Sequence, residues 1–214
     1  MGVLDILQKG GPLMWLLVLC SLTALGAFAE RIIYFHRASM DVGDFLTGLS
    51  TLIRKGNYTE ALQEAANTPG PVARVIRAAL ARRQLPRTEL RDIVQEAGQL
   101  EVPKLERNLP LLSTVAYVAP LIGLLGTVVG LLESFQVISN HSGYTTAADM
   151  AGGIYQSLLT TGTGIAIAIP AYVAFCYLSS RANEMIHDME RGGIEVLHLI
   201  HDSQVTELPA KTAP

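Results

Sequence analysis

Charged residues are scarce in this chain, and the scarcity is concentrated in three stretches. Asp, Glu, Lys and Arg make up 16% of the 214 residues, whereas about a quarter of the residues in a soluble domain are charged. Residues 12–29, 108–132 and 150–180 contain no charged side chain at all. A helix needs about 20 mostly apolar residues to cross a bilayer. The composition therefore argues against a purely soluble chain and predicts an all-α membrane protein with three transmembrane helices.

Lysine and arginine are absent between the second and third apolar stretches, from 133 to 149. Twelve of them lie between the first and second stretches, and cytoplasmic loops are the ones that carry excess basic residues. The sequence thus predicts a multi-pass inner-membrane protein with a periplasmic N-terminus and a cytoplasmic C-terminus. The expected segments are a periplasmic start (1–11), a first span (12–35), a cytoplasmic helical domain (36–107), a second span (108–139), a periplasmic hairpin (140–148), a third span (149–180) and a cytoplasmic helical tail with a disordered end (181–214).

A signal peptide is the alternative interpretation of the first stretch. Ala27-Phe28-Ala29 is similar to the small-residue site at which a leader is cleaved. The leader is only weakly basic, however, because Asp5 offsets Lys9. The apolar character also resumes after Arg31, which favours a retained span.

Residues for disulfide, metal or covalent chemistry are few. The two cysteines, Cys20 and Cys176, lie in apolar stretches, so neither predicts a disulfide framework. His187, His198 and His201 lack a carboxylate or thiol to complete a metal site. The formal net charge of −3 does not favour nucleic acid as a partner. We therefore expect no metal, no cofactor and no enzymatic activity.

The middle segment has the spacing of amphipathic helices. Apolar residues recur at helical intervals in 45–53 and 72–80, with breaks at Gly56-Asn57 and at 68–71. Thr88 is a candidate N-cap for the next helix, and Pro103 and Pro110 are expected to kink or interrupt it before the second span. The tail keeps helical spacing and is expected to prolong the third span, although Gly192-Gly193 weakens that continuity. The second and third helices are thus predicted to be long and to extend into the cytoplasmic domain.

Small and hydroxyl-bearing residues form a stripe on each of the last two spans. Small residues let helices approach closely in lipid, where packing drives association. Close packing alone is one interpretation of this pattern. The stripe on the second span consists of Ala116, Ala119, Gly123, Thr127, Gly130 and Ser134, and the stripe on the third span consists of Gly153, Ser157, Thr161, Gly164 and Ala168.

Thr127 and Thr161 lie deep in their spans, and Thr160 and Thr163 flank the latter. Each hydroxyl can satisfy itself on the carbonyl three or four residues earlier, so a structural role stays open. The alternative is that both face a polar pathway at the centre of a bundle. No Asp, Glu, Lys, Arg or His lies in the uncharged stretches, and intramembrane proton relays need an ionisable group. If protons cross here, the carboxylate should come from another polypeptide.

Two motifs in these spans are similar to those of a known family. Residues 119–130, Ala-Pro-Leu-Ile-Gly-Leu-Leu-Gly-Thr-Val-Val-Gly, and residues 158–164, Leu-Leu-Thr-Thr-Gly-Thr-Gly, resemble the second- and third-span signatures of the MotA/TolQ/ExbB proton-channel family. Glu30-Arg31 after the first span also fits. Three spans resemble the ExbB and TolQ branches.

The resemblance implies a pentamer of this chain around a dimer of a single-span ExbD/TolR-like protein, whose membrane helix supplies an aspartate. It implies that proton flow past this aspartate drives a periplasmic machine, either TonB-dependent outer-membrane transport or the Tol–Pal system. Thr127 and Thr161 would face the aspartate. Gln156 departs from family members that carry an acidic residue there, and Gly162-Thr163 is a smaller departure.

Two sets of site residues follow. The proposed proton pathway comprises Thr127, Thr161, Thr160, Ser157, Gln156 and Ser134. The proposed packing positions are Ala119, Pro120, Gly123, Gly126, Gly130, Gly164, Ala168 and Pro170. A solute transporter is disfavoured because the chain shows no inverted repeat and no charged binding residue. A non-conducting scaffold would explain the small stripes but not the two threonines.

Overall fold

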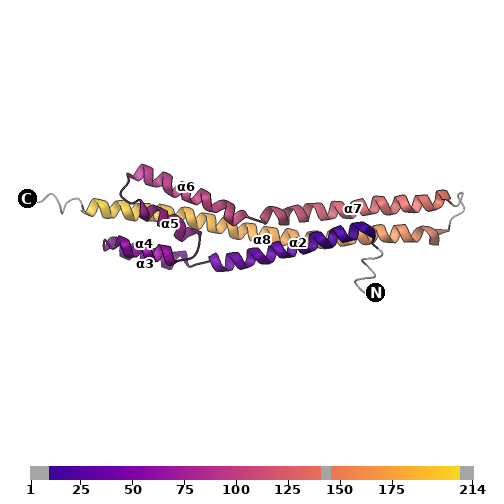
Figure 1. Ribbon diagram of the computed structural model, residues 1–214, viewed down its shortest axis with the longest axis horizontal. Helices are drawn as coiled ribbons and strands as arrows, with labels where there is room; N and C mark the ends of the chain where they lie inside the picture. Colours follow the sequence, from indigo (N-terminus) through magenta and orange to yellow (C-terminus); the bar gives the residue numbers. More distant parts are fainter. Residues whose placement is uncertain (1–9, 141–145, 208–214) are drawn as a thin grey trace, which may run out of the picture. The chain divides into compact units, whose positions relative to one another are not determined.

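The computed structural model describes residues 10–140 and 146–207 (Figure 1), and every regular element in these ranges is an α-helix. The hairpin expected at 140–148 falls largely outside these ranges, and the end that was expected to be disordered lies outside them. The helices are α2 (Gly11–Ala38), α3 (Val42–Arg54), α4 (Tyr58–Asn67), α5 (Pro71–Ala81), α6 (Arg87–Glu106), α7 (Leu109–Asn140) and α8 (Ala147–Glu207).

Among the described residues, three helical segments are long and apolar enough to cross a membrane, and they overlap the three predicted spans. The predicted spans lie in α2, α7 and the first half of α8. The chain divides into two compact units. Unit 1 consists of residues 1–31 and 108–178, and unit 2 of residues 32–107 and 179–214.

In unit 1, α7 and the first part of α8 lie side by side (Figure 1). The buried residues of α7 recur every three or four positions, as in Leu112, Ala119 and Gly126. Its opposite surface carries large exposed apolar side chains such as Leu124 and Phe135. In a membrane, such a surface faces lipid or another helix rather than water.

Unit 2 packs the short helices α3 to α5 with α6 and the end of α8. Asp41 caps α3, since its carboxylate accepts from the backbone N–H groups of Gly43 and Asp44 at 3.0 and 3.2 Å. Pro71 opens α5 at a position where no backbone N–H is needed. Gly70, at φ +120°, precedes it in a conformation that L side chains rarely adopt.

Proline affects the second long helix differently from the prediction. The helix α6 runs through Pro103 to Glu106, and the break falls at Arg107 and Asn108. Pro110 lies in the first turn of α7, where its missing N–H removes no bond. The expected interruption before the second span is therefore present, but it falls between the two prolines and separates α6 from α7. Thr88 is also not the N-cap of α6, which begins at Arg87 after Pro86.

The third long helix extends beyond its span, as predicted, and is unbroken at Gly192-Gly193. A Cβ on Gly192 would lie 3.0 Å from Val72 Cγ1, and one on Gly193 would lie 2.6 Å from Val94 Cγ1. The two glycines therefore allow α8 to approach α5 and α6 closely. The expectation that they weaken the helix is wrong, because tertiary packing outweighs intrinsic helix propensity.

Candidate functional site

The small stripes of α7 and α8 meet along a line of close backbone approach, here called the α7–α8 seam. A Cβ added to Gly123 would lie 3.0 Å from the Cα of Thr161, and one added to Gly164 would lie 2.6 Å from the carbonyl oxygen of Ala119. At Gly126, a Cβ would lie 2.7 Å from the Cβ of Thr160. Only glycine fits at these positions without moving a helix.

The predicted packing residues divide by location. Six lie buried, namely Ala119, Gly123, Gly126, Gly130, Gly164 and Ala168. The two prolines lie elsewhere: Pro120 is half-buried and Pro170 is exposed. Pro170 lines an apolar groove of about 630 Å³ that α2 shares with α8 through residues such as Ala24 and Phe28.

Three of the predicted pathway hydroxyls are buried within the chain itself. Ser134, Ser157 and Thr160 are 2, 4 and 1% exposed. Ser157 donates to the carbonyl of Ile154 at 2.7 Å, and Thr160 donates to that of Ser157 at 3.0 Å. Ser134 is 3.0 Å from the carbonyl of Gly130 and 3.3 Å from that of Met150. Within one chain these residues contribute to packing of the seam.

The two mid-span threonines and Gln156 keep part of their surface exposed. Thr161 Oγ1 donates across the seam to the carbonyl of Gly123 at 2.9 Å. Thr127 Oγ1 donates to the carbonyl of Leu124, within its own helix, at 2.6 Å. A hydroxyl has one hydrogen and two lone pairs. Each threonine hydroxyl that donates its hydrogen to a carbonyl still has lone pairs that can accept a hydrogen bond.

Gln156 lies against the start of α2. A Cβ on Gly11 would be 2.6 Å from Gln156 Nε2, so the amide occupies the space beside that glycine. Gly11 has φ +69°. The sequence did not predict this contact, because residues 11 and 156 are far apart in the chain.

A polar cluster at the end of the first span was also not predicted as a site. Arg31, only 2% exposed, approaches the carboxylate of Glu30 with Nη2–Oε1 at 2.6 Å and Nε–Oε2 at 3.0 Å. Asn108 Nδ2 donates to the same carboxylate at 2.6 Å. The sequence identified Glu30-Arg31 only as a pair that fits the family after the first span. The burial of Arg31 and the bond from Asn108 emerge only from the fold.

Unit 2 contains a second ionic cluster, around Glu101, whose side chain is 7% exposed. Arg74 and Lys104 each place a nitrogen 2.7 Å from one of its oxygens. Burial alone would raise the pKa of the Glu101 carboxyl, but the hydrogen bonds and charges of Arg74 and Lys104 outweigh it and hold the pKa below its ordinary value. The pKa of Arg74 is raised, since the hydrogen bond and charge of Glu101 outweigh the effect of burial.

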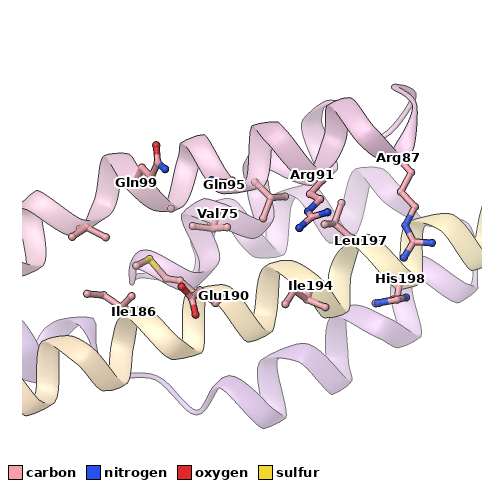
Figure 2. Close-up of a pocket in the computed structure, with 14 residues that line it drawn as sticks. Val75, Arg87, Arg91, Gln95, Gln99, Ile186, Glu190, Ile194, Leu197 and His198 are labelled. Atoms are coloured by element: carbon pink, nitrogen blue, oxygen red, sulfur yellow. The ribbon is translucent and has the colours of Figure 1, made fainter.

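A groove of about 680 Å³ lies in unit 2 between α6 and α8. Figure 2 shows Arg87 and Arg91 reaching from α6 toward the part of α8 that carries Leu197 and His198. The remaining lining is mainly apolar and includes Val75, Val94, Val102, Ile186, Met189 and Ile194. In the described residues, no group of three or more His, Cys, Asp or Glu side chains is placed to hold a metal ion.

The fold and the seam define a three-span helical membrane protein in which two spans pack through small residues. The model of the MotA/TolQ/ExbB proton channel family matches residues 67–191, which is more than half of the chain. The chain therefore belongs to this family, which confirms the resemblance found in its span motifs.

Curated relatives match over most of their own length. The chain is 28% identical over 213 residues to a biopolymer transport protein ExbB homolog of Methanothermobacter thermautotrophicus, covering 96% of this chain and 75% of the relative. It is 28% identical over 198 residues to biopolymer transport protein exbB1 of Vibrio cholerae, covering 86% of this chain and 82% of the relative. It is 30% identical over 175 residues to Tol-Pal system protein TolQ of Pseudomonas aeruginosa, covering 76% of this chain and 68% of the relative.

Family membership and the three apolar helices together identify a multi-pass inner-membrane protein of an energy-transducing family. Members named ExbB and members named TolQ both match. The comparisons therefore do not distinguish these two branches.

Proposed function

We propose that this chain is the channel subunit of a proton-driven complex and that a second polypeptide supplies the group that carries the proton. The observation that supports this most strongly is the absence of Asp, Glu, Lys, Arg and His from 12–29, 108–132 and 150–180. Intramembrane proton relays depend on ionisable side chains. A channel built from these spans alone would lack one.

Thr127 and Thr161 are the proposed contacts of the missing carboxylate. Both hydroxyls donate to main-chain carbonyls, so their lone pairs are available to a protonated carboxyl group or to water. A neutral acceptor of this kind stabilises the protonated acid as it crosses the apolar region. In this proposal Ser134, Ser157 and Thr160 hold the seam together and do not contact the proton.

Family membership supports a proposal for the partner and the assembly. We propose a homopentamer around an ExbD/TolR-like single-span protein that contributes an intramembrane aspartate. The basic residues of 36–107 support a cytoplasmic location for this segment and a periplasmic N-terminus. TonB-dependent outer-membrane transport is the proposed output, and a Tol–Pal envelope system is the alternative.

The test is proton conductance in liposomes. The chain alone should conduct poorly, the chain co-purified with the product of the adjacent gene should conduct, and replacing the partner's intramembrane Asp with Asn should abolish the difference. Native mass spectrometry of the same samples would count the copies. Robust conductance by the chain alone would refute the proposal, and no conductance by the intact complex would favour a non-conducting scaffold.

A further inference from the structure

The break between α6 and α7 contains one left-handed residue, Asn108, which follows the non-helical Arg107. Asn108 has φ +63°, and it is the one non-glycine residue with positive φ among residues 10–140 and 146–207. Asparagine tolerates this conformation better than most residues do. The break contains only Arg107 and Asn108, so Asn108 immediately precedes the first turn of α7.

The side chain of Asn108 is bonded to a residue 78 positions earlier in the chain. Its Nδ2 lies 2.6 Å from Oε2 of Glu30. The same oxygen lies 3.0 Å from Nε of Arg31, and Oε1 lies 2.6 Å from Nη2. Arg31 therefore holds the carboxylate through two charge-assisted bonds, and the carboxylate holds Asn108.

The burial of Arg31 makes this cluster more than a surface ion pair. The Arg31 side chain is 2% exposed, whereas that of Glu30 is 45% exposed. A guanidinium removed from water requires a compensating anion, and removing that anion is strongly destabilising. Neighbouring residues on a helix do not normally face each other, so the pairing of Glu30 with Arg31 reflects this local requirement.

We propose that Glu30, Arg31 and Asn108 form a latch that fixes the start of α7 against α2, and that Glu30 and Asn108 are positioning residues for the proton pathway. Thr127 lies 19 residues beyond Asn108, or about 28 Å along an α-helix. A rotation of about 10° at the break would move Thr127 by about 5 Å over that length. The functional part of this inference rests on the proposed function, whereas the structural part does not.

The structural part is tested by hydrogen exchange at the amides of residues 113–117, the first of α7 with intrahelical partners. Asn108→Gly keeps access to positive φ but removes the amide. It should accelerate exchange by about tenfold, the effect of losing one hydrogen bond to a charged group. Glu30→Gln should accelerate exchange more than Asn108→Gly does, since it also removes the anion that compensates the buried Arg31, and the double variant should exchange no faster than Glu30→Gln alone.

The control is Thr114→Val in the same turn, whose hydroxyl bonds only to the carbonyl of Pro110 in the described structure. It should exchange like the wild type. Wild-type exchange in Asn108→Gly would overturn the latch, since the position would then require only a permissive backbone. Fully additive effects of Glu30→Gln and Asn108→Gly would overturn it as well.

The functional part is tested by proton-coupled turnover of the complete complex. Asn108→Gly and Glu30→Gln should each lower turnover at least about fivefold with the partner still bound, and the double variant should be no worse than the more affected single variant. Faster exchange with unchanged turnover would overturn the positioning role. A wild-type complex that shows no turnover would count against the proposed function, while the exchange result would still decide the latch.

Discussion

The hydroxyl of Thr161 on α8 donates to the main-chain carbonyl of Gly123 on α7, with oxygen atoms 2.9 Å apart. The missing side chain of Gly123 favours this close approach, since a Cβ there would lie 3.0 Å from the Cα of Thr161. The glycine and the threonine thus act as a pair. Together they place a hydroxyl at mid-depth in a region that contains no ionisable group.

Close approach along the seam predicts opposite outcomes for two glycines one half-turn apart on α8. Gly164→Ala would place a Cβ 2.6 Å from the backbone oxygen of Ala119, which cannot move without shifting α7. It should destabilise the folded chain by about 1–3 kcal/mol. Gly162→Ala meets no atom within 4 Å and should stabilise the helix by up to about 1 kcal/mol. Thermal unfolding in detergent would measure both, and equal effects would contradict the seam.

The Glu101 cluster predicts a pH dependence for unit 2. Because the pKa of Glu101 is lowered in the folded state, its stabilising contribution is present above the pKa of the unfolded chain and is lost as the pH falls through the folded value. At pH 7, Glu101→Gln should cost about 1–2 kcal/mol.

The difference between the wild type and Glu101→Gln should shrink steadily as the pH is lowered from about 5 toward 3. Melting temperatures across this range would measure it. Glu96→Gln, at an exposed position on the same helix, is the matched control and should follow the wild type at every pH. A difference that stays constant with pH would mean that the charge of Glu101 has no role.

Tyr58 of α4 makes two separable contacts, one with the end of α8 and one with Arg83, which lies between α5 and α6. Its hydroxyl lies 2.6 Å from Ser203 Oγ and donates to it, since Ser203 gives its own hydrogen to Ile200. The guanidinium of Arg83 lies 4.6 Å from the centre of the ring. Tyr58→Phe should cost about 1 kcal/mol, and Tyr58→Leu about 0.5–1 kcal/mol more. Chemical denaturation would separate the two, and equal losses would rule out a cation–π contribution.

The sequence predicted the features that depend on composition and on local spacing. The three apolar helices, the small stripes and the family were all found this way, and the buried Gly123 and Gly164 lie where the stripe predicted. The sequence could not predict which hydroxyls are consumed by packing. Thr160 and Thr161 are adjacent in sequence. Yet Thr160 is buried and its hydroxyl donates within α8, whereas the hydroxyl of Thr161 donates to a carbonyl of α7.

Long-range partners were also beyond the sequence. Nothing in the local pattern pairs Asn108 with Glu30 or Arg74 with Glu101, because each pair is brought together by tertiary packing. The break at Asn108 was misplaced for a similar reason. Proline was expected to kink or interrupt the helix, whereas α6 runs through Pro103 and ends before Arg107, whose ψ of 135° is not helical, and Asn108 follows with φ +63°.

The most direct test of the account compares three valine substitutions by proton uptake into liposomes that contain the complete complex with its partner. Thr127→Val and Thr161→Val remove the two proposed pathway hydroxyls, and Thr161→Ser, which keeps the bond to Gly123, should restore uptake. Thr163→Val removes a half-buried hydroxyl that bonds only within α8, to Leu159 at 2.8 Å. We expect proton uptake to fall at least about tenfold in Thr127→Val and Thr161→Val with assembly intact. In Thr163→Val it should change less than about twofold. Wild-type uptake in both Thr127→Val and Thr161→Val would contradict the account and leave only helix packing as the role of these threonines.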